Sequence, residues 1–555
     1  MLVNSKLPPL DDSLIDKIAI DFVDSVVYVE ETLHWKPLFQ TWLKRCERNG
    51  VKLDVKYAAL DEVAALRSKG LRTVEKIEDD QVNLPKAMDL ITTGADYNAS
   101  DIHLMMRGEH TEIQFVIKGE TRTYQMIGQT EGEELARAVY QGLAKTKAAS
   151  WKPLEFQSAQ IPDDVLPPDL GLASARIIRG PMYPVNKGGA FMTIRLQYSD
   201  TRPELRRKRK LHALPLPRKP AGDFALLEMG YTRSNVEKLG LLMSVPHGVI
   251  IVTGPTGSGK TTLLYEVMKE KARIRPGRRQ ITIEDPIELP YEWAVQLPVT
   301  DTRGDEENGD AFAERGQTAL RMAPNTLMFG EARGANVAVE VIRGAQTGHD
   351  TWTTTHVSDP FQAIERWETL DPVRLNRKLF CDPVTLRGFV GVRLLPRLCK
   401  GCCVKLTDHL EDVPSRIVDA LRTWGDIEGV NLRGPGCEAC GFDSVTKREA
   451  VCEVVVNDEK LAHDLIHFDV STARQNYRAR PDADPSMLDE SIRRVLAGLV
   501  DPRDVEDRVE LISPRRTGEG ERVVSLREAS QEISRPRNIA DPVESAEMME
   551  AAAHA

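Results

Sequence analysis

The sequence predicts an α/β protein whose largest domain is built on a parallel sheet. Three observations support this prediction. Residues 248–253 form an apolar run with the length of a buried strand, and this run passes directly into a glycine-rich loop and a helical segment. Two further short strand-like segments, 280–284 and 326–329, are followed or closed by acidic residues. Strand-like and helical segments also alternate over residues 223–398, which is the order that a parallel sheet requires.

The loop after the first of these strands has the composition of a phosphate-binding loop. Glycine lets backbone N–H groups turn toward an anion, and the start of the following helix adds its positive dipole end. The pattern therefore predicts a bound nucleoside triphosphate. The residues expected to hold it are Gly254, Pro255, Thr256, Gly257, Ser258, Gly259, Lys260, Thr261 and Thr262. Lys260 is expected to reach the β- and γ-phosphates, and Thr261 to bind Mg²⁺.

Acidic residues follow two of the other predicted strands. Glu284 ends the segment 280–284, at the edge of the sheet where nucleotides bind in open α/β folds. It is predicted to be the general base that deprotonates the attacking water, with Glu288 and Glu331 as the alternatives. Glu331 follows the segment 326–329 and is expected to hold Mg²⁺, directly or through water.

Two histidines come later in the same domain, around a hydroxyl-rich segment that is predicted to be a strand. His349 precedes the segment 351–355, and His356 follows it. A lone histidine is usually a packing residue, but these two come after two strands that end in acids. A catalytic role in sensing the γ-phosphate and a role in packing are therefore both open for them.

The composition is that of a multidomain globular protein. The chain has 555 residues, of which 41% are hydrophobic, and it carries a net charge of −10. This length corresponds to about three or four domains. The net charge argues against a nucleic-acid coat protein. Because the chain lacks a long apolar run and its first residues do not resemble a signal peptide, a cytoplasmic location is expected.

The chain divides into five predicted regions. Residues 1–85 form a small domain, either α/β or mostly helical, and residues 86–198 form an α/β domain with an antiparallel sheet. Residues 199–222 are rich in proline and basic residues and are predicted to be a linker. Residues 223–512 form the nucleotide-binding domain, and residues 513–555 are expected to be a disordered tail.

Three local features add detail to this division. A helix is predicted at residues 133–147, and an amphipathic helix from Ser486 to about Gly498, for which ordinary packing is the favoured role. The basic cluster 206–210 is interpreted as part of a solvated linker, with contact to nucleic acid or to an acidic membrane surface as the alternative.

Four of the eight cysteines form two Cys-x-x-Cys pairs. The pairs are Cys399 with Cys402 and Cys437 with Cys440. Two such pairs can make a tetrahedral site of four sulfur ligands, which suits Zn²⁺ in a structural role. A redox-active dithiol is the alternative, and the adjacent Cys403 is a spare thiol that could exchange into the site.

The order of these motifs resembles the type II/type IV secretion ATPase family. The P-loop is followed by Ile-Glu-Asp-Pro-Ile-Glu at 283–288, Gly-Glu-Ala-Arg at 330–333 and Thr-Gly-His at 347–349. In the preceding domain, Ala-Ser-Asp-Ile-His at 99–103 is similar to a family signature, and the resemblance runs from about residue 94 to 512. It implies a RecA-like P-loop ATPase domain preceded by a PAS-like domain, working with ATP and Mg²⁺ in a hexameric ring.

The resemblance also implies partners and further site residues. Arg176 and Arg195 are expected to contact the γ-phosphate, and the four cysteines are expected to form a zinc insertion typical of assembly ATPases. The implied function is the assembly of a type IV pilus, or of a type II secretion or conjugative pseudopilus. A platform protein of the inner membrane is the expected partner, so that membrane association is peripheral. Residues 1–85 are expected to bind this platform or a regulator. A DNA-stimulated conjugative transfer ATPase and a non-enzymatic scaffold are the alternatives.

Overall fold

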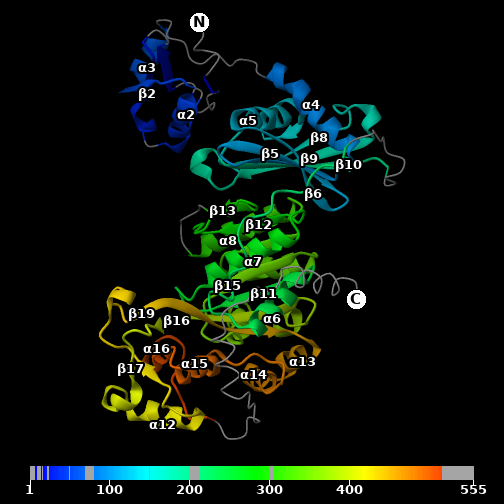
Figure 1. Ribbon diagram of the computed structural model, residues 1–555. Coiled ribbons are helices and arrows are strands. Elements are labelled where there is room, and N and C mark those ends of the chain that lie inside the picture. The colour runs from blue at the N-terminus through cyan, green and yellow to red at the C-terminus, as the bar shows by residue number, and fades with distance from the viewer. Residues whose placement is uncertain are drawn as a thin grey trace.

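The computed structural model describes residues 17–68, 80–200, 212–299 and 305–515, with short gaps at 22–23, 35, 49 and 149, together with residues 7, 8 and 14. Three larger sheets follow one another along the molecule (Figure 1). The predicted disordered tail lies outside the described residues from 516 onward, and so does the basic cluster 206–210.

In the described part of the chain, seven strands form the sheet of the C-terminal domain. In their order across the sheet these are β13 (Val295–Pro298), β12 (Gln280–Glu284), β14 (Thr326–Phe329), β15 (Asp350–Thr355), β11 (Gly248–Thr253), β16 (Leu386–Leu398) and β19 (Val445–Val456). All neighbours are parallel except β16 and β19. The predicted parallel sheet is therefore confirmed, and we call this unit the parallel-sheet domain.

Helices cover both faces of this sheet, as a parallel sheet requires. Helices α6 (Arg233–Ser244) and α7 (Lys260–Ile274) pack on one face, where their apolar residues share a core with Ile250 and Val252. Helices α8 (Asp305–Leu320) and α9 (Ala335–Gln346) pack on the other face, against Ile281 and Ile283. Successive side chains of a strand point to opposite faces of the sheet, so alternate residues pack against different helix layers.

Shorter elements complete the C-terminal half. They are α10 (Gln362–Leu370), α11 (Arg377–Phe380), β17 (Val404–Lys405), α12 (Ser415–Trp424), β18 (Asn431–Leu432), α13 (Glu459–His467), α14 (Val470–Arg478), α15 (Met487–Leu496) and α16 (Pro502–Arg508). The predicted amphipathic helix corresponds to α15, which Ser486 caps, and its residues Met487, Ile492 and Val495 are buried in a core. Ordinary packing therefore accounts for its apolar face.

The preceding domain contains an antiparallel sheet, and we call it the antiparallel-sheet domain. Its strands, in order across the sheet, are β6 (Glu120–Gly128), β5 (His110–Ile117), β4 (Asp101–Met106), β10 (Ala190–Tyr198), β9 (Leu172–Pro181), β8 (Gln157–Pro162) and β7 (Thr146–Lys147). Helices α4 (Asp80–Asp96) and α5 (Gln129–Arg137) cover one face of the sheet. The other face is turned toward the parallel-sheet domain (Figure 1).

Two predicted boundaries in this region were wrong. The boundary at residue 85 falls inside α4, whose residues Ala87, Leu90 and Ile91 pack in the core of the antiparallel-sheet domain. The helix predicted at 133–147 begins earlier, as α5, and continues as a π-helical turn only to Leu143. It ends there because Ala144 is extended, which lets the next residues pair with β8.

The second half of the predicted linker packs against the antiparallel-sheet domain. Leu214 is buried in the core of that domain, and the Thr123 N–H donates to the carbonyl group of Pro215. Residues 212–215 therefore run as an extended segment along β6 rather than as a free tether.

The two domains also contact each other along the edge strand β13. The Tyr183 N–H donates to the Gln296 carbonyl oxygen at 3.0 Å, and Arg107 Nη1 donates to the Ala294 carbonyl oxygen at 3.1 Å. The apolar side chains that share a core across this contact are Met105, Ile178, Met182, Phe191, Val295 and Leu297. One continuous core therefore joins the two sheets.

The N-terminal unit has its own small core. Strands β1 (Ile18–Asp21), β2 (Val26–Glu30) and β3 (Asp54–Ala58) form its sheet, beside α2 (Pro37–Arg48) and α3 (Leu60–Ser68). Of the two forms left open by the sequence, the structure has the α/β one. Among the helices of the described ranges, none combines the length and the low charge that a bilayer crossing requires.

Candidate nucleotide site and cysteine cluster

The loop between β11 and α7 has the backbone geometry of an anion cradle. Gly254, Gly257 and Gly259 have φ angles of 151°, 75° and 93°, which residues other than glycine rarely adopt. A Cβ atom at Gly254 would lie 2.4 Å from the Ser258 Oγ and 2.6 Å from the Val392 carbonyl oxygen. The turn therefore closes tightly only because this residue is glycine, and the loop leads directly into the N-terminus of α7, whose positive dipole end favours an anion.

Lys260 begins helix α7 and lies within this loop. Its Nζ donates to the carbonyl oxygens of Gly254 at 2.8 Å and Pro255 at 3.0 Å. Burial lowers the pKa of Lys260 to about 8, an effect that the nearby charge of Glu331 opposes. The ammonium group is thus held where the phosphate oxygens of a nucleotide would compete for it.

Glu331 and His356 lie together at the same edge of the sheet. Glu331 Oε1 is 3.2 Å from His356 Nε2, and its other oxygen accepts from Arg333 Nε at 2.8 Å. Both residues follow the carboxyl ends of parallel strands, β14 and β15, of which β15 pairs with β11 and β14 is the next strand beyond it. The structure therefore brings Glu331 and His356 near Lys260, as the sequence predicted for a nucleotide site.

Glu284 ends β12 and is 5% exposed. Its Oε1 accepts two hydrogen bonds, from Thr282 Oγ1 at 2.5 Å and from Gln296 Nε2 at 2.9 Å. Burial raises the pKa of the Glu284 carboxyl group, while these two bonds lower it. Among the described residues, no hydrogen-bond donor lies on Oε2, which leaves that oxygen for a water molecule. A carboxylate with a raised pKa suits general-base chemistry near neutral pH.

Three residues around this site were missed by the sequence reasoning. Thr282 and Gln296 hold Glu284, and the buried Arg393 on β16 lies close enough to lower the pKa of Lys260. Thr282 was signalled by the polar alternation along 280–284. Gln296 and Arg393 come from strands whose pairing no local pattern reveals.

His349 lies at the opposite edge of the sheet from the P-loop. Its carbonyl oxygen accepts from the N–H of Gly248, the first residue of β11, whereas the P-loop follows the last residue of that strand. Its Nδ1 is 3.1 Å from the Gly344 carbonyl oxygen, and burial lowers its pKa. Of the two roles left open for His349, this position fits packing and does not fit phosphate sensing.

Arg176 and Arg195 are direct partners on the paired strands β9 and β10. They point to the face of the sheet that carries Ile178 and Phe191, which is the face turned toward the parallel-sheet domain. Arg195 Nε donates to Asp101 Oδ1 at 2.9 Å. Among the described residues, neither arginine forms a hydrogen bond or ion pair with the P-loop.

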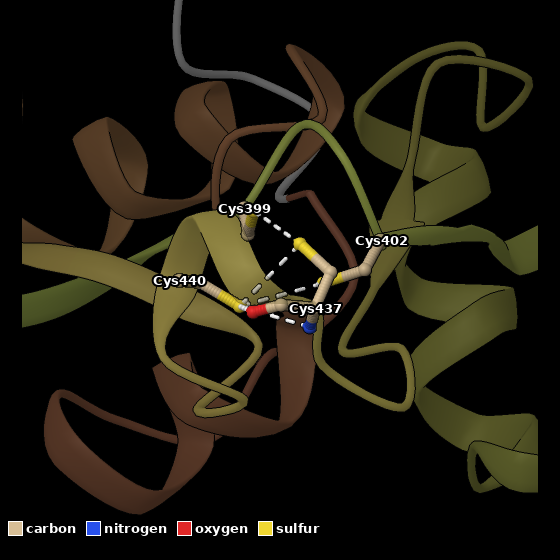
Figure 2. Close-up of side chains that lie close together, drawn as sticks. All are labelled: Cys399, Cys402, Cys437 and Cys440. Carbon is tan, nitrogen blue, oxygen red and sulfur yellow. Dashed lines mark hydrogen bonds between the residues drawn. The ribbon is translucent and has the colours of Figure 1, made fainter.

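The four cysteines of the two pairs meet in one cluster (Figure 2). Their sulfur atoms all lie within 4.8 Å of one another, and the closest pairs are 3.7 to 3.8 Å apart. These distances are too long for disulfide bonds. A tetrahedral zinc ion with Zn–S distances of about 2.3 Å separates its sulfur ligands by about 3.8 Å. The cluster therefore has the donor set and the spacing of a zinc site.

The surroundings of the cluster support this assignment. The Cys437 N–H donates to the Cys440 Sγ at 3.3 Å and lowers the pKa of Cys440, whereas burial and the neighbouring thiols raise the pKa of Cys402. Cys440 is therefore the thiol of this cluster that most readily becomes the thiolate that binds metal. A Cβ atom at Gly434 would lie 1.6 Å from the Cys402 carbonyl oxygen. The backbone at residue 434 can therefore pack against Cys402 only because this residue is glycine. Cys403, the spare thiol, is directed to the Lys400 carbonyl oxygen and is not one of the four.

Taken together, the P-loop edge can bind a phosphate chain, hold a divalent cation and position a base. Residues 214–510 match the family model described as "Type II/IV secretion system protein". This match covers more than half of the chain and includes both the P-loop and the cysteine cluster.

Curated relatives include a type IV pilus assembly ATPase, PilB of Thermus thermophilus, and a type II secretion system protein E of Klebsiella pneumoniae. The chain is 29% identical to the first over 296 residues, which are 52% of this chain and 31% of the relative. It is 27% identical to the second over 388 residues, which are 69% of this chain and 67% of the relative. The chain thus spans about a third of the length of the first relative.

Solved structures also show similarity, at low identity. The VirB11 ATPase from the Brucella suis type IV secretion system, solved with sulphate, is 21% identical, with a TM-score of 0.38. The comparison covers 56% of this chain and 92% of that one.

Proposed function

Because the chain belongs to the type II/IV secretion system protein family, we propose that it is a Mg²⁺-dependent ATPase that powers a secretion or pilus machine. The observation that carries this proposal is the meeting of Lys260, Glu284 and Glu331 at the carboxyl edge of one parallel sheet. Such an edge is where open α/β folds bind ligands and where P-loop enzymes perform phosphoryl transfer.

Each of these residues has a role in the proposed reaction. Lys260 would bind the β- and γ-phosphates, and Thr261 and Glu331 would hold Mg²⁺, which neutralises phosphate charge when bound. Glu284 would take the proton of the attacking water on its Oε2. His356, beside Glu331, would respond to the state of the γ-phosphate through that carboxylate.

Arg176 and Arg195 complete the proposal as contacts to the γ-phosphate. They lie on the face of the antiparallel-sheet domain that is turned toward the parallel-sheet domain, and both are exposed. Since Arg195 is held by Asp101, this role requires either a movement of the domain or a contribution from a neighbouring copy.

We further propose that the protein acts as a hexamer at the cytoplasmic face of the inner membrane. There it would drive the assembly of a type IV pilus or of a type II secretion or conjugative pseudopilus. The names of its relatives, a pilus assembly ATPase and a type II secretion protein, support this class of machine. The N-terminal unit, which has its own core, is the candidate for binding a membrane platform protein.

A nucleotide hydrolysis assay with and without DNA tests this proposal. The purified protein is expected to hydrolyse ATP with Mg²⁺, to stop when the metal is chelated and to be indifferent to DNA. Stimulation by DNA that falls steeply with salt would instead indicate a conjugative transfer ATPase that uses the cluster 206–210. Absence of hydrolysis under all conditions would indicate a scaffold.

The cysteine cluster is proposed to hold a structural zinc ion. Substitution Cys440→Ser is expected to reduce bound zinc from about one ion per chain to a small fraction and to lower the melting temperature, since structural zinc contributes to folding. Metal analysis under reducing, chelator-free conditions measures this. Cys403→Ser is the matched control and should keep its zinc, because that thiol lies outside the cluster. A parent protein without zinc would contradict the assignment.

A further inference from the structure

We propose that Gln296 is the positioning residue that holds the general base Glu284 in place for water deprotonation. This inference rests on the proposed ATPase function. Gln296 lies on the edge strand β13, where its Cα is paired with that of Thr282 on β12. Because side chains of directly paired residues point to the same face of a sheet, Gln296 stands beside the carboxyl end of β12.

Every polar atom of the Gln296 side chain is used in this position. Its Nε2 donates to Glu284 Oε1 at 2.9 Å and to the Leu289 carbonyl oxygen at 2.9 Å. Its Oε1 accepts from the Tyr291 N–H at 2.7 Å. Since a backbone N–H can only donate, this last bond fixes the orientation of the amide and turns its NH₂ group toward Glu284.

These bonds tie the carboxylate to the loop that follows it. Glu284 and its second donor Thr282 lie on β12, whereas Leu289 and Tyr291 lie in the segment between β12 and β13. One buried amide therefore holds the base and two points of the next loop together. Because Thr282 and Gln296 both donate to Oε1, they select one orientation of the carboxylate and leave Oε2 for the water.

The strand that carries Gln296 is itself held from the antiparallel-sheet domain. The Gln296 carbonyl oxygen accepts from the Tyr183 N–H at 3.0 Å, and Arg107 binds the carbonyl oxygen two residues earlier. Gln296 is 2% exposed, and its neighbours Val295 and Leu297 are buried in the shared core. An edge strand fixed in this way is a rigid support for a catalytic group.

Substitution Gln296→Met tests the inference, because methionine keeps the length of the side chain and removes the N–H donor. We expect kcat for ATP to fall by about 10- to 100-fold, as for the loss of other supporting contacts to a catalytic group, with KM nearly unchanged. In the pH profile of kcat, the fall on the acid side should also move to higher pH. The reason is that Glu284 loses a donor that stabilised its ionised form, so its pKa rises. The other titratable groups facing Glu284 are Glu288 and Tyr291, and neither is altered.

Gln280→Met is the matched control. Gln280 lies on β12, is also 2% exposed, and bonds to Trp293 and Met268 rather than to Glu284. Its substitution should affect stability but leave the acid limb where it is in the parent. If both variants lose turnover equally without a shift of the limb, Gln296 is only a packing residue and the inference is overturned.

Two further outcomes are decisive. An active parent together with a Gln296→Met variant of equal kcat and equal pH profile would overturn the positioning role and leave the proposed function standing. A parent without ATPase activity would overturn both. If Gln296→Met does not fold, Gln296→Glu replaces it, since that side chain still accepts from Tyr291. It is expected to lower kcat at least tenfold at neutral pH, because a second carboxyl group then faces Glu284, and parent-level turnover would refute the role.

Discussion

Substitution Lys260→Ala is expected to lower kcat for ATP hydrolysis by about 10³-fold or more while the fold is retained. Among the described residues, the Lys260 Nζ donates only to two carbonyl groups of its own loop. The nearby Glu331 keeps Arg333 and His356 as partners, so removal of Lys260 leaves no buried charge without a partner. What is lost is the one cation that the P-loop offers to the β- and γ-phosphates. A coupled ATPase assay measures the loss of turnover, and a thermal melt of the same preparation measures the fold.

Lys271→Ala is the informative control for this substitution. Lys271 lies near the other end of α7 and forms an ion pair at 2.8 Å with the buried Asp350, and the Lys271 side chain itself is only 12% exposed. Removing one partner of a buried pair destabilises a protein by about 3–5 kcal/mol. This control should therefore melt earlier yet hydrolyse ATP while folded, which is the opposite of the result for Lys260→Ala. Turnover at the parent rate in Lys260→Ala would contradict the assignment of this loop as the nucleotide-binding site.

The nucleotide edge was predictable because its signals are local. The P-loop motif is eight consecutive residues, 254–261, that lead from the end of one strand into the first turn of one helix. Glu284 is the last residue of β12, and Glu331 comes two residues after the end of β14. In a parallel sheet, all strands deliver their carboxyl ends to the same edge. Once the parallel sheet was predicted, the position of these residues at one edge followed from the shared direction of the strands.

The same rule explains why the prediction for His349 does not fit the structure. His349 and His356 are close in the sequence, but the strand β15 lies between them. Six residues of strand extend for about 20 Å, so two residues that flank a strand belong to opposite edges of the sheet. Only His356, at the carboxyl end of β15, could join Glu331.

Residues that reach the site only through strand pairing could not be predicted from the sequence. Gln296 reaches Glu284 only because β13 pairs with β12, and Arg393 approaches Lys260 only because β16 pairs with β11. Neither register is specified by a local pattern, since each depends on which strand becomes the neighbour. The cysteine cluster could be predicted despite the long separation of its halves, because two Cys-x-x-Cys pairs carry their own spacing signal.

Substitution Glu284→Gln is expected to lower kcat by about 10²- to 10⁴-fold and to leave ATP binding intact. The amide has the size of the carboxyl group, and its oxygen can still accept from Thr282 and Gln296, so the site keeps its shape. A neutral amide, however, cannot take a proton from water. Binding of a fluorescent nucleotide analogue, measured beside turnover, separates these two effects.

The pH dependence of the parent gives the same residue a second test. Burial raises the pKa of Glu284, so the carboxyl group is protonated and inactive as a base at a higher pH than an ordinary glutamate. The rate should therefore fall as the pH drops through this raised value, and in Glu284→Gln the limb should vanish with the activity. Glu288→Gln, at an exposed position of the same loop, should keep most of the turnover. Its acid limb should remain but move to lower pH, because the charge of Glu288 raises the pKa of Glu284. If Glu288→Gln is the slow variant and Glu284→Gln is not, the base is Glu288, and the buried carboxylate with its two donors serves only to hold the strand.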